Sequence, residues 1–332
     1  MPDTLSFTQC YHCGVMGTYR VLTGPTAAGK TAALLVRAKV QPLAVISADS
    51  RQVYRFMDIG TAKPTFSEQK ILPHYGIDCF KPGTSYSVYQ FLIEALDGLK
   101  QATESGRAAW VCGGTGLYIY ALVNALGLGG PPRARLRHAL AGKVRLQSPR
   151  QLTVELGLSV SDPDNPVRVI RAAEHACDDP ERAASIYRWA GMDEGQAQQE
   201  SIEGSSGRQL VGEIQRWRCL GVAVLDPGRE ELLRRIELRV RAMFETGLLD
   251  EVAGLRQQGF GDTNVVRDGI GYREAGSVLD GSLSTEEAIN ATIISTRQYA
   301  KRQRTYYRGR GWPVVPPHEL PAWIDGTNKV EG

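Results

Sequence analysis

Eight consecutive residues near the start of the chain constrain its fold more than any others. Residues 24–31 read GPTAAGKT and fit the pattern G-x-x-x-x-G-K-[ST] without a gap. In such a loop the glycines allow the backbone to wrap closely, so that successive N–H groups point at phosphate oxygens. A helix that starts there adds the positive end of its dipole. The pattern therefore predicts a phosphate-binding loop, or P-loop, between a strand and a helix.

The segments around this loop have the order that the motif requires. Tyr19–Thr23 is typical of a short buried strand, Thr31–Lys39 of a helix, and Leu43–Ser47 of a second apolar strand that ends just before Asp49. Strand, loop, helix and strand in so short a stretch form a βαβ unit and imply a parallel sheet. A glycine-rich loop that arose by chance would lack these neighbours.

The same alternation continues along the chain. Tyr86–Thr103 has apolar residues at helical spacing, Ala108–Cys112 is typical of a strand, and the glycine-rich run 113–116 leads into a helix over Leu117–Leu126. Gly221–Leu225 is expected to return to the sheet, and four helices are expected to complete the protein. We therefore predict an α/β fold with a P-loop NTPase-like parallel sheet flanked by helices, a small helical insertion domain and a helical C-terminal region.

Changes in composition suggest the domain boundaries. Glycine and proline are dense around Gly127–Pro132, and from there to about Arg218 the chain is rich in Arg, Gln and Ala with weak periodicity. We interpret the latter segment as the helical insertion. The predicted organisation is an N-terminal extension (1–18), the first part of the P-loop core (19–130), the helical insertion (131–218), the second part of the core with the C-terminal helices (219–312) and a tail (313–332).

Composition argues against a membrane protein and against a disulfide scaffold. No apolar run approaches the roughly 20 residues of a membrane span. The first residues also lack the basic start and apolar core of a secretion signal, so we expect a cytoplasmic protein without a membrane partner. Six cysteines in 332 residues do not suggest a disulfide scaffold. Cys10 and Cys13 have metal-ligand spacing, but a second pair is missing, so we interpret them as two thiols on a tail rather than a zinc site.

The P-loop alone indicates only that a phosphate or a diphosphate is held. In a kinase the nucleophile attacks phosphorus, whereas in a prenyl transferase it attacks the carbon that bears the diphosphate. Lys30 is expected to supply a mobile positive charge, and the Thr31 hydroxyl is placed to ligate Mg²⁺, the cofactor that we predict. The predicted diphosphate- or nucleotide-binding residues are Gly24, Pro25, Thr26, Ala27, Ala28, Gly29, Lys30 and Thr31.

Five further segments resemble the motifs of one enzyme family. Residues 47–54 read SADSRQVY, residues 57–64 read MDIGTAKP, and residues 113–118 read GGTGLY. Near the end of the chain, residues 269–274 read GIGYRE and residues 296–303 read TRQYAKRQ. In this order, and over roughly Val21–Arg308, they closely resemble the motifs of the tRNA dimethylallyltransferases.

The resemblance implies a prenyl transfer to RNA. A dimethylallyl group would pass from dimethylallyl diphosphate to the N6 amino group of an adenine in the tRNA anticodon loop, position 37 in the family, with release of diphosphate. The expected partners are tRNA and dimethylallyl diphosphate, and we expect a monomer.

The resemblance also implies catalytic roles for Asp49, Thr31, Thr115 and Arg239. Asp49 resembles the residue that takes a proton from the adenine amino group, which is a poor nucleophile without a base. The alternative is a carboxylate that only organises Mg²⁺ and water. Thr115 and Arg239 would lie on the leaving diphosphate, where negative charge grows as the C–O bond breaks. Arg239 lies on a flank of the predicted helix Arg229–Thr246, one turn from Arg235, and a solvated arginine face is the alternative there.

Residues in three parts of the chain are expected to contact tRNA. An adenine must leave its stack to reach a buried diphosphate, and the polar run after the second strand could hold it, with Gln52 as a hydrogen-bond partner. Arg133, Arg168 and Arg171 match tRNA-facing arginines of the family. The predicted tRNA-binding residues are Asp49, Ser50, Arg51, Gln52, Thr115, Arg133, Arg168, Arg171, Arg297, Gln298, Lys301, Arg302 and Arg304.

The last long helix is expected to carry a basic stripe. Ser284 with Glu287 three residues on forms a capping box at its start, and Gly309 is a normal helix stop. The segment 297–310 contains six basic residues and no acidic one. Arg297, Lys301, Arg304 and Arg308 fall on one face and could track a phosphate backbone, although a solvated charged face would look similar.

Three other functions remain open from the sequence. Free AMP or ADP could be the prenyl acceptor, the chain could be a small-molecule P-loop kinase, or it could be an RNA-binding protein with an inactive P-loop. The basic helix and the insertion favour a large RNA over AMP. The intact set of Lys30, Thr31, Asp49 and Thr115 argues against an inactive loop.

Overall fold

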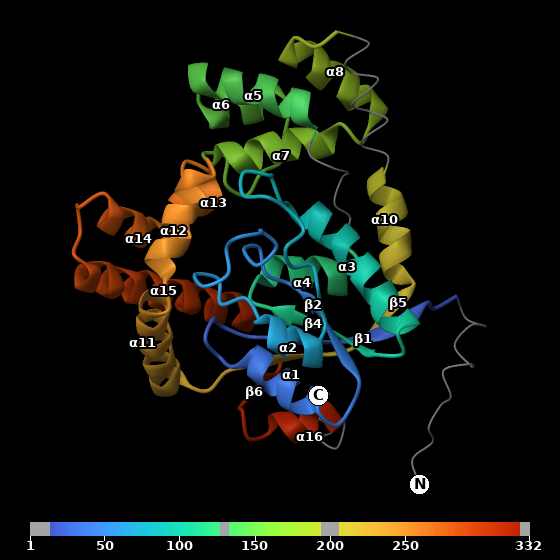
Figure 1. Ribbon diagram of the computed structural model, residues 1–332. Coiled ribbons are helices and arrows are strands. Elements are labelled where there is room, and N and C mark those ends of the chain that lie inside the picture. The colour runs from blue at the N-terminus through green and yellow to red at the C-terminus, as the bar shows by residue number, and fades with distance from the viewer. Residues whose placement is uncertain (1–13, 127–132, 194–205, 326–332) are drawn as a thin grey trace. The chain divides into compact units, whose positions relative to one another are not determined.

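A parallel sheet lies at the centre of the larger of two structural units (Figure 1). The computed structural model describes residues 14–126, 133–193 and 206–325. Within these residues the sheet has six strands in the order β3-β2-β4-β1-β5-β6, and every neighbouring pair is parallel. The α/β fold with a parallel sheet is thus confirmed. The strands are β1 (Gly17–Thr23), β2 (Leu43–Ser47), β3 (His74–Tyr75), β4 (Ala108–Gly113), β5 (Trp217–Leu225) and β6 (Val314–Val315).

The central strands are apolar because helices cover both faces of the sheet. All five residues of β2 are buried. Helix α1 (Lys30–Ala38) leads from β1 to β2, and α3 (Val88–Glu104) leads back from β3 to β4. Right-handed crossovers that run in opposite directions along a sheet put their helices on opposite faces. On the α1 face, Leu34 packs with Leu22 and Trp110 in one core cluster.

Three loops of interest leave the sheet at one edge. The P-loop follows β1, Asp49 follows β2, and the run 113–116 ends β4 and begins α4 (Gly116–Val123). Because the strands are parallel, their carboxyl ends meet at the same edge, which is where open α/β sheets bind ligands. The fold therefore gathers the residues that the sequence analysis singled out.

The helices that follow β5 pack around a second hydrophobic core. The buried stripe Leu232, Ile236 and Val240 of α11 packs there with residues of α12, α14 and α15. Four helices were expected after β5, and this number is wrong, because the described chain forms six. The two shortest have only four and six residues, too few to show a periodic pattern. The helices are α11 (Arg229–Glu245), α12 (Leu248–Gln257), α13 (Asn264–Arg267), α14 (Tyr272–Leu279), α15 (Thr285–Arg308) and α16 (Leu320–Asp325), with α2 (Phe66–Ile71) earlier in the chain.

Helix α15 has the predicted ends. Ser284 is the N-cap, its hydroxyl accepts from Glu287 N, and the Glu287 carboxylate accepts from Ser284 N at 2.8 Å. Gly309 follows the last helical residue. The capping box thus fixes where the longest helix of the described chain begins.

The second unit is helical and spans Asn124–Gln215. Ser148, Asn165 and Asp179 each cap a helix that begins with proline, a residue whose missing N–H costs nothing at that position. Its core includes Leu136, Leu140, Leu152, Val169 and Ile186. The predicted domain limits, including 131–218 for the insertion, stay a prediction. The helices are α5 (Ala134–Leu146), α6 (Pro149–Glu155), α7 (Pro166–Ala176), α8 (Pro180–Ala190) and α10 (Ser206–Gln215).

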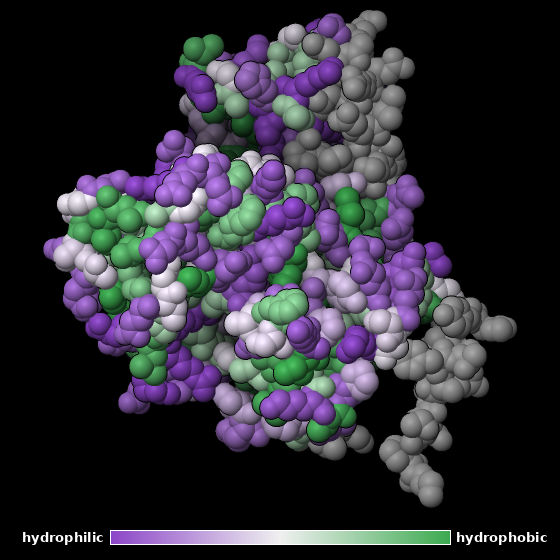
Figure 2. All heavy atoms as spheres, viewed as in Figure 1, coloured by the Kyte–Doolittle hydropathy of each residue, from purple (hydrophilic) through white to green (hydrophobic). Residues whose placement is uncertain are grey.

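Hydrophilic side chains cover much of the visible surface, with small hydrophobic groups between them (Figure 2). No helix in the described part of the chain has the length and apolar character to cross a membrane. Cys79, Cys112, Cys177 and Cys219 are free thiols. Cys10, Cys13 and the predicted boundary Gly127–Pro132 lie outside the described residues.

Candidate functional site

A cavity of about 660 Å³ opens at the carboxyl edge of the sheet, within the larger unit. A second cavity of about 320 Å³ adjoins it, because Thr26, Asp49, Thr61, Arg239 and Tyr299 line both. The first cavity is also lined by Lys30 and Thr31 of the P-loop, and the second by Ser50, Arg51 and Arg302. The structure therefore brings together most of the predicted residues of the core.

The P-loop presents unused backbone donors. Gly29 precedes α1 with φ of 95°, and no side chain caps this helix. Within the described protein, nothing accepts from the amides of Gly29, Lys30 and Thr31. Helix N-termini leave such amides without intrahelical partners, and the dipole favours an anion beside them. The loop is thus arranged as an anion-binding site.

Lys30 adds a cation to this wall. Its Nζ donates to Gly24 O and to Pro25 O, both at 3.0 Å. Burial lowers the pKa of Lys30, and the nearby negative charge of Asp49 partly offsets this. No carboxylate of the described chain forms an ion pair with Lys30. Its charge is therefore available to a ligand.

Arg239 of α11 supplies a second cation beside the loop. Its guanidinium donates to the Thr26 hydroxyl and to Thr61 O, both at 3.3 Å. Burial lowers the pKa of Arg239, again against the effect of Asp49. Among the described residues it also has no ion pair. Two partly buried cations without carboxylate partners favour an anionic ligand.

Asp49 lies near both cations and lines the same cavity. Its Oδ1 accepts from Arg51 N at 2.8 Å and from Gln52 N at 3.3 Å, the pattern of an Asx turn. No donor of the described protein bonds to its other oxygen, Oδ2. The backbone therefore fixes the carboxylate while one oxygen stays free.

Two predicted residues make contacts that differ from those expected. The Thr115 hydroxyl accepts from Ser50 N at 3.2 Å, and Thr115 lines neither cavity. Gln52 accepts from the Ser47 hydroxyl and donates to Thr61 O and Ala62 O, so both ends of its amide are occupied. The structure thus shows both side chains bracing the loop that carries Asp49. Their expected roles toward the diphosphate and the adenine stay predictions.

Helix α15 closes the site with residues that the site prediction missed. Gln303 accepts from Thr26 N and donates to Gly114 O, both at 2.8 Å. The Tyr307 hydroxyl donates to the same Gly114 carbonyl at 2.9 Å. A Cβ added at position 114 would displace the Gln303 amide from this place. A signal for Gln303 exists, since this polar residue lies on the buried face that contains Ala300 and Tyr307.

The basic stripe of α15 is only partly free. Arg304 pairs with Asp226 at 2.7 Å, and Arg297 lies 3.6 Å from Glu237. Acidic residues of the same unit hold these two side chains, and their expected contact with tRNA stays a prediction. Lys301 and Arg308 are exposed, and no carboxylate of the described chain pairs with them, while Gln298 and Arg302 are also exposed.

Two predicted arginines of the insertion serve its interior. Arg133 has only 4% of its side chain exposed and pairs with Asp178 at 2.9 Å and with the Tyr187 hydroxyl. Glu174, 1% exposed, binds Arg171 at 3.1 Å and Arg137 at 2.7 Å, and it also accepts from Arg133 N. A buried carboxylate needs such partners. Arg133 is therefore buried, whereas Arg168 is exposed, and the expected role of these arginines toward tRNA stays a prediction.

Comparisons with known proteins agree with the geometry. The family model described as IPP transferase matches residues 52–310. A tRNA dimethylallyltransferase of Pseudothermotoga lettingae is 36% identical over 311 residues, covering 93% of each chain. The tRNA isopentenylpyrophosphate transferase of Bacillus halodurans has a similar structure, with a TM-score of 0.61, 31% identity and coverage of 93% of this chain and 95% of its own. A eukaryotic dimethylallyltransferase acting on tRNA shares the fold, with a TM-score of 0.62, 21% identity and coverage of 92% of this chain and 75% of its own.

Proposed function

Because this chain belongs to the IPP transferase family, we propose that it is a tRNA dimethylallyltransferase that modifies the N6 amino group of an adenine in the anticodon loop. The donor is dimethylallyl diphosphate, and diphosphate is the second product. The acceptor adenine corresponds to position 37 in the family.

One observation supports this proposal most: two cationic side chains without carboxylate partners in the described chain lie beside backbone N–H groups that have no acceptor there. Lys30 and Arg239 line the larger cavity, together with the uncapped start of α1. A diphosphate carries several negative charges on neighbouring oxygens and suits backbone N–H groups and cations arranged in this way. An apolar or neutral ligand would leave both cations without a partner.

The reaction follows from these positions. The C–O bond of the donor breaks, its electron pair stays on the diphosphate oxygen, and the adenine nitrogen bonds to the freed carbon. Arg239 and Lys30 stabilise the charge that develops on the leaving oxygen. Asp49, held through Oδ1, takes the proton that the amino nitrogen loses, and Oδ2 has no protein donor competing for it.

Mg²⁺ fits this site as a companion of the diphosphate. It is usually held by one or two protein ligands together with phosphate oxygens and water, and Thr31 and Asp49 line the same cavity. We assign Thr31 as its ligand, and the ion would neutralise part of the diphosphate charge. The base role then stays with Asp49.

The acceptor is proposed to approach along α15. Lys301, Arg302 and Arg308 form an exposed basic surface, and Arg302 also lines the smaller cavity. Ser50 and Arg51 line that cavity as well and offer polar contacts to an extruded adenine. We further propose that the enzyme acts as a monomer in the cytoplasm.

A labelling experiment tests the function against its alternatives. The protein is incubated with Mg²⁺, dimethylallyl diphosphate labelled in its carbon chain, and either unmodified tRNA or AMP. We expect label in tRNA and not in AMP, with pyrophosphate appearing in equal amount by phosphorus NMR. Label in AMP would identify an adenylate prenyltransferase. Phosphate transferred from ATP would support a kinase instead.

A further inference from the structure

One carboxylate outside the two cavities holds a backbone turn that forms part of their wall. Glu251 lies in the first turn of α12. Its Oε2 accepts from Asp58 N at 3.0 Å and from Ile59 N at 2.7 Å, and its Oε1 accepts from Gly60 N at 3.2 Å. Three successive amides thus converge on one side chain. A carboxylate accepts such bonds better than a neutral group does.

Tyr272 of α14 completes this anchor. Its hydroxyl donates to Glu251 Oε1 at 2.6 Å. Burial, and then the charge of Glu251, raise the pKa of Tyr272, so the hydroxyl keeps its proton and remains a donor. The ring lies against the turn so closely that a Cβ added at Gly60 would clash with it. The turn is therefore held by both charge and packing.

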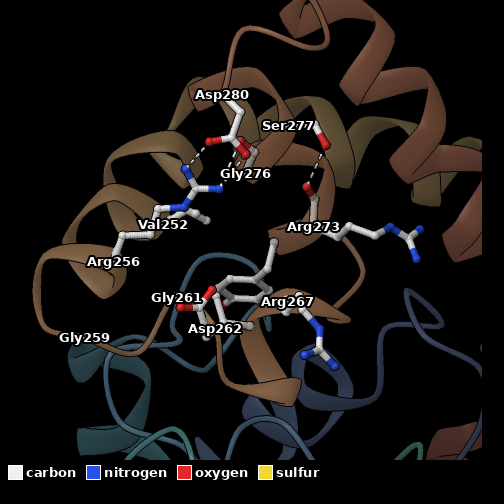
Figure 3. A pocket seen from close by; sticks show the side chains of 12 residues that line it. Val252, Arg256, Gly259, Gly261, Asp262, Arg267, Arg273, Gly276, Ser277 and Asp280 are labelled. Atoms are coloured by element: carbon white, nitrogen blue, oxygen red, sulfur yellow. Dashed lines mark hydrogen bonds and ion pairs between the residues drawn. The ribbon is translucent and has the colours of Figure 1, made fainter.

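The two helices that carry this anchor are tied to each other. Arg256 of α12 donates to both oxygens of Asp280, which follows α14, at 2.7 and 3.0 Å (Figure 3). Its guanidinium also donates to Gly276 O at 3.2 Å. The cavity of about 590 Å³ in this view has Arg256 and Asp280 on its wall. This pair therefore links α12, which carries Glu251, with the end of α14, which carries Tyr272.

The anchored turn leads directly to the cation of the donor site. The residue after Gly60 is Thr61, whose carbonyl accepts from Arg239 at 3.3 Å and from Gln52 at 3.3 Å. On the far side of the turn, the Lys63 ammonium, 3% exposed, pairs with Asp58 at 2.5 Å and Asp78 at 2.6 Å. A shift of the turn would therefore move an acceptor of Arg239.

We propose that Glu251 is a positioning residue for the diphosphate site. It holds the amides of residues 58–60 so that Thr61 O directs the Arg239 guanidinium toward the cavity. Glu251 acts only through this backbone, since it lines neither cavity. The assignment of diphosphate as the ligand rests on the proposed function.

The test compares Glu251→Gln with Asp250→Asn. The first variant replaces one acceptor oxygen by an NH₂ group that cannot accept from an amide. The second removes the same charge from the neighbouring residue of the same helix turn, where Asp250 is exposed and bonds to none of these amides. For Glu251→Gln we expect pyrophosphate binding by calorimetry, and kcat/KM for the donor, to fall by about 10- to 100-fold, as small misplacements of a binding group do. We expect tRNA affinity to be unchanged, and Asp250→Asn to behave as the wild type.

Equal pyrophosphate affinities in the two variants would overturn the proposal. It would also fail if Glu251→Gln weakened tRNA and pyrophosphate binding in proportion to a lowered Tm. Gly60→Ala provides a second test, because it displaces the same turn from Tyr272 while the carboxylate remains. It should weaken pyrophosphate selectively, and wild-type affinity in a folded Gly60→Ala protein would contradict the role of the turn. Pyrophosphate binding needs no turnover, so a wild type that prenylates nothing would refute the proposed function without affecting this comparison.

Discussion

Asp49 allows chemistry to be separated from binding at the scale of one residue. In Asp49→Asn the remaining side-chain oxygen can still accept from Arg51 N and Gln52 N, the two bonds that fix its position. The variant loses only the ability to take a proton. We expect turnover to fall by about 10²- to 10⁴-fold, the usual contribution of a general base, while donor and tRNA dissociation constants change little. Single-turnover kinetics measure this, and near-normal turnover would remove the base assignment.

The lowered pKa of Lys30 leads to a prediction about how pyrophosphate binding depends on pH. Burial lowers its pKa from the ordinary 10.5, so the ammonium loses its proton at a lower pH than a free lysine does. Pyrophosphate affinity should therefore fall as pH rises through the lowered pKa, and binding there should take up protons. The folded state binds fewer protons than the unfolded state between the two pKa values, so the free energy of unfolding should rise with pH in that window.

Calorimetry in buffers of different ionisation enthalpy, over a series of pH values below the ordinary lysine pKa, follows both the affinity and the proton uptake. Lys30→Met serves as the control, since it should bind pyrophosphate weakly and without proton uptake. The same pH dependence in Lys30→Met would assign the titration to another group.

The site residues that could be predicted from sequence are those that are positioned by neighbouring residues of the chain. Lys30 and Asp49 belong to contiguous motifs, and the backbone that positions them is the motif itself. Gln303, Glu251 and the partner of Arg304 are different, because each acquires its role from a residue in a distant segment. A charged or polar side chain looks the same in sequence whether it faces solvent or closes a loop.

At the scale of elements, α15 has two faces with different tasks. Gln303 and Tyr307 face the P-loop, whereas Lys301 and Arg308 are exposed. If these two cations contact phosphates, replacing both by alanine should flatten the slope of log K for tRNA against log salt by about 1.4–1.8, since each contact releases counterions. Filter binding at several salt concentrations measures the slope.

Two controls accompany this double variant. Replacing Lys70 and Lys100, exposed lysines on α2 and α3, removes the same charge elsewhere and should leave the slope as it was. Arg304→Ala should lower the Tm instead, because its partner is Asp226. An unchanged slope in the folded Lys301 and Arg308 double variant would show that these two side chains face solvent and do not contact tRNA.

Elements were predictable where they were long enough to show a period. α3, α11 and α15 each bury a regular apolar stripe, and their predicted limits lie close to the observed ones. β3 and β6 have two residues each and exist only through pairing with β2 and β5. Such strands have no pattern of their own, so they follow from the tertiary structure alone.

At the scale of the whole molecule, a destabilising substitution in one unit should leave the other unit folded. Glu174 and its arginine partners all belong to the smaller unit. Glu174→Ala removes the partner of Arg137 and Arg171 and leaves the buried Arg133 N without its acceptor, and an unsatisfied buried donor typically costs about 1–3 kcal/mol. We expect limited proteolysis to cut the smaller unit of this variant sooner, while pyrophosphate binding in the larger unit persists.

Arg150→Ala is the matched control for this loss. Its ion pair with Asp164 also lies in the smaller unit, but both side chains are well exposed, and such pairs contribute only about 0–1 kcal/mol. Its proteolysis should resemble that of the wild type. Loss of pyrophosphate binding in Glu174→Ala would instead show that the larger unit depends on the smaller one.

The Gln303 bond to Thr26 N has a consequence for how the protein is made. It joins residues 277 positions apart, so the first loop of the core must wait for one of the last helices to leave the ribosome. A nascent chain that ends before α15 already contains Lys30, Asp49 and Arg239, yet it lacks the Gln303 side chain that bonds to both glycine loops. The ability to bind donor should therefore arise late in translation and abruptly. Ribosome-bound chains stalled before and after Gln303 would differ in pyrophosphate retention, although both contain Lys30 and Arg239, the two cations of the donor cavity.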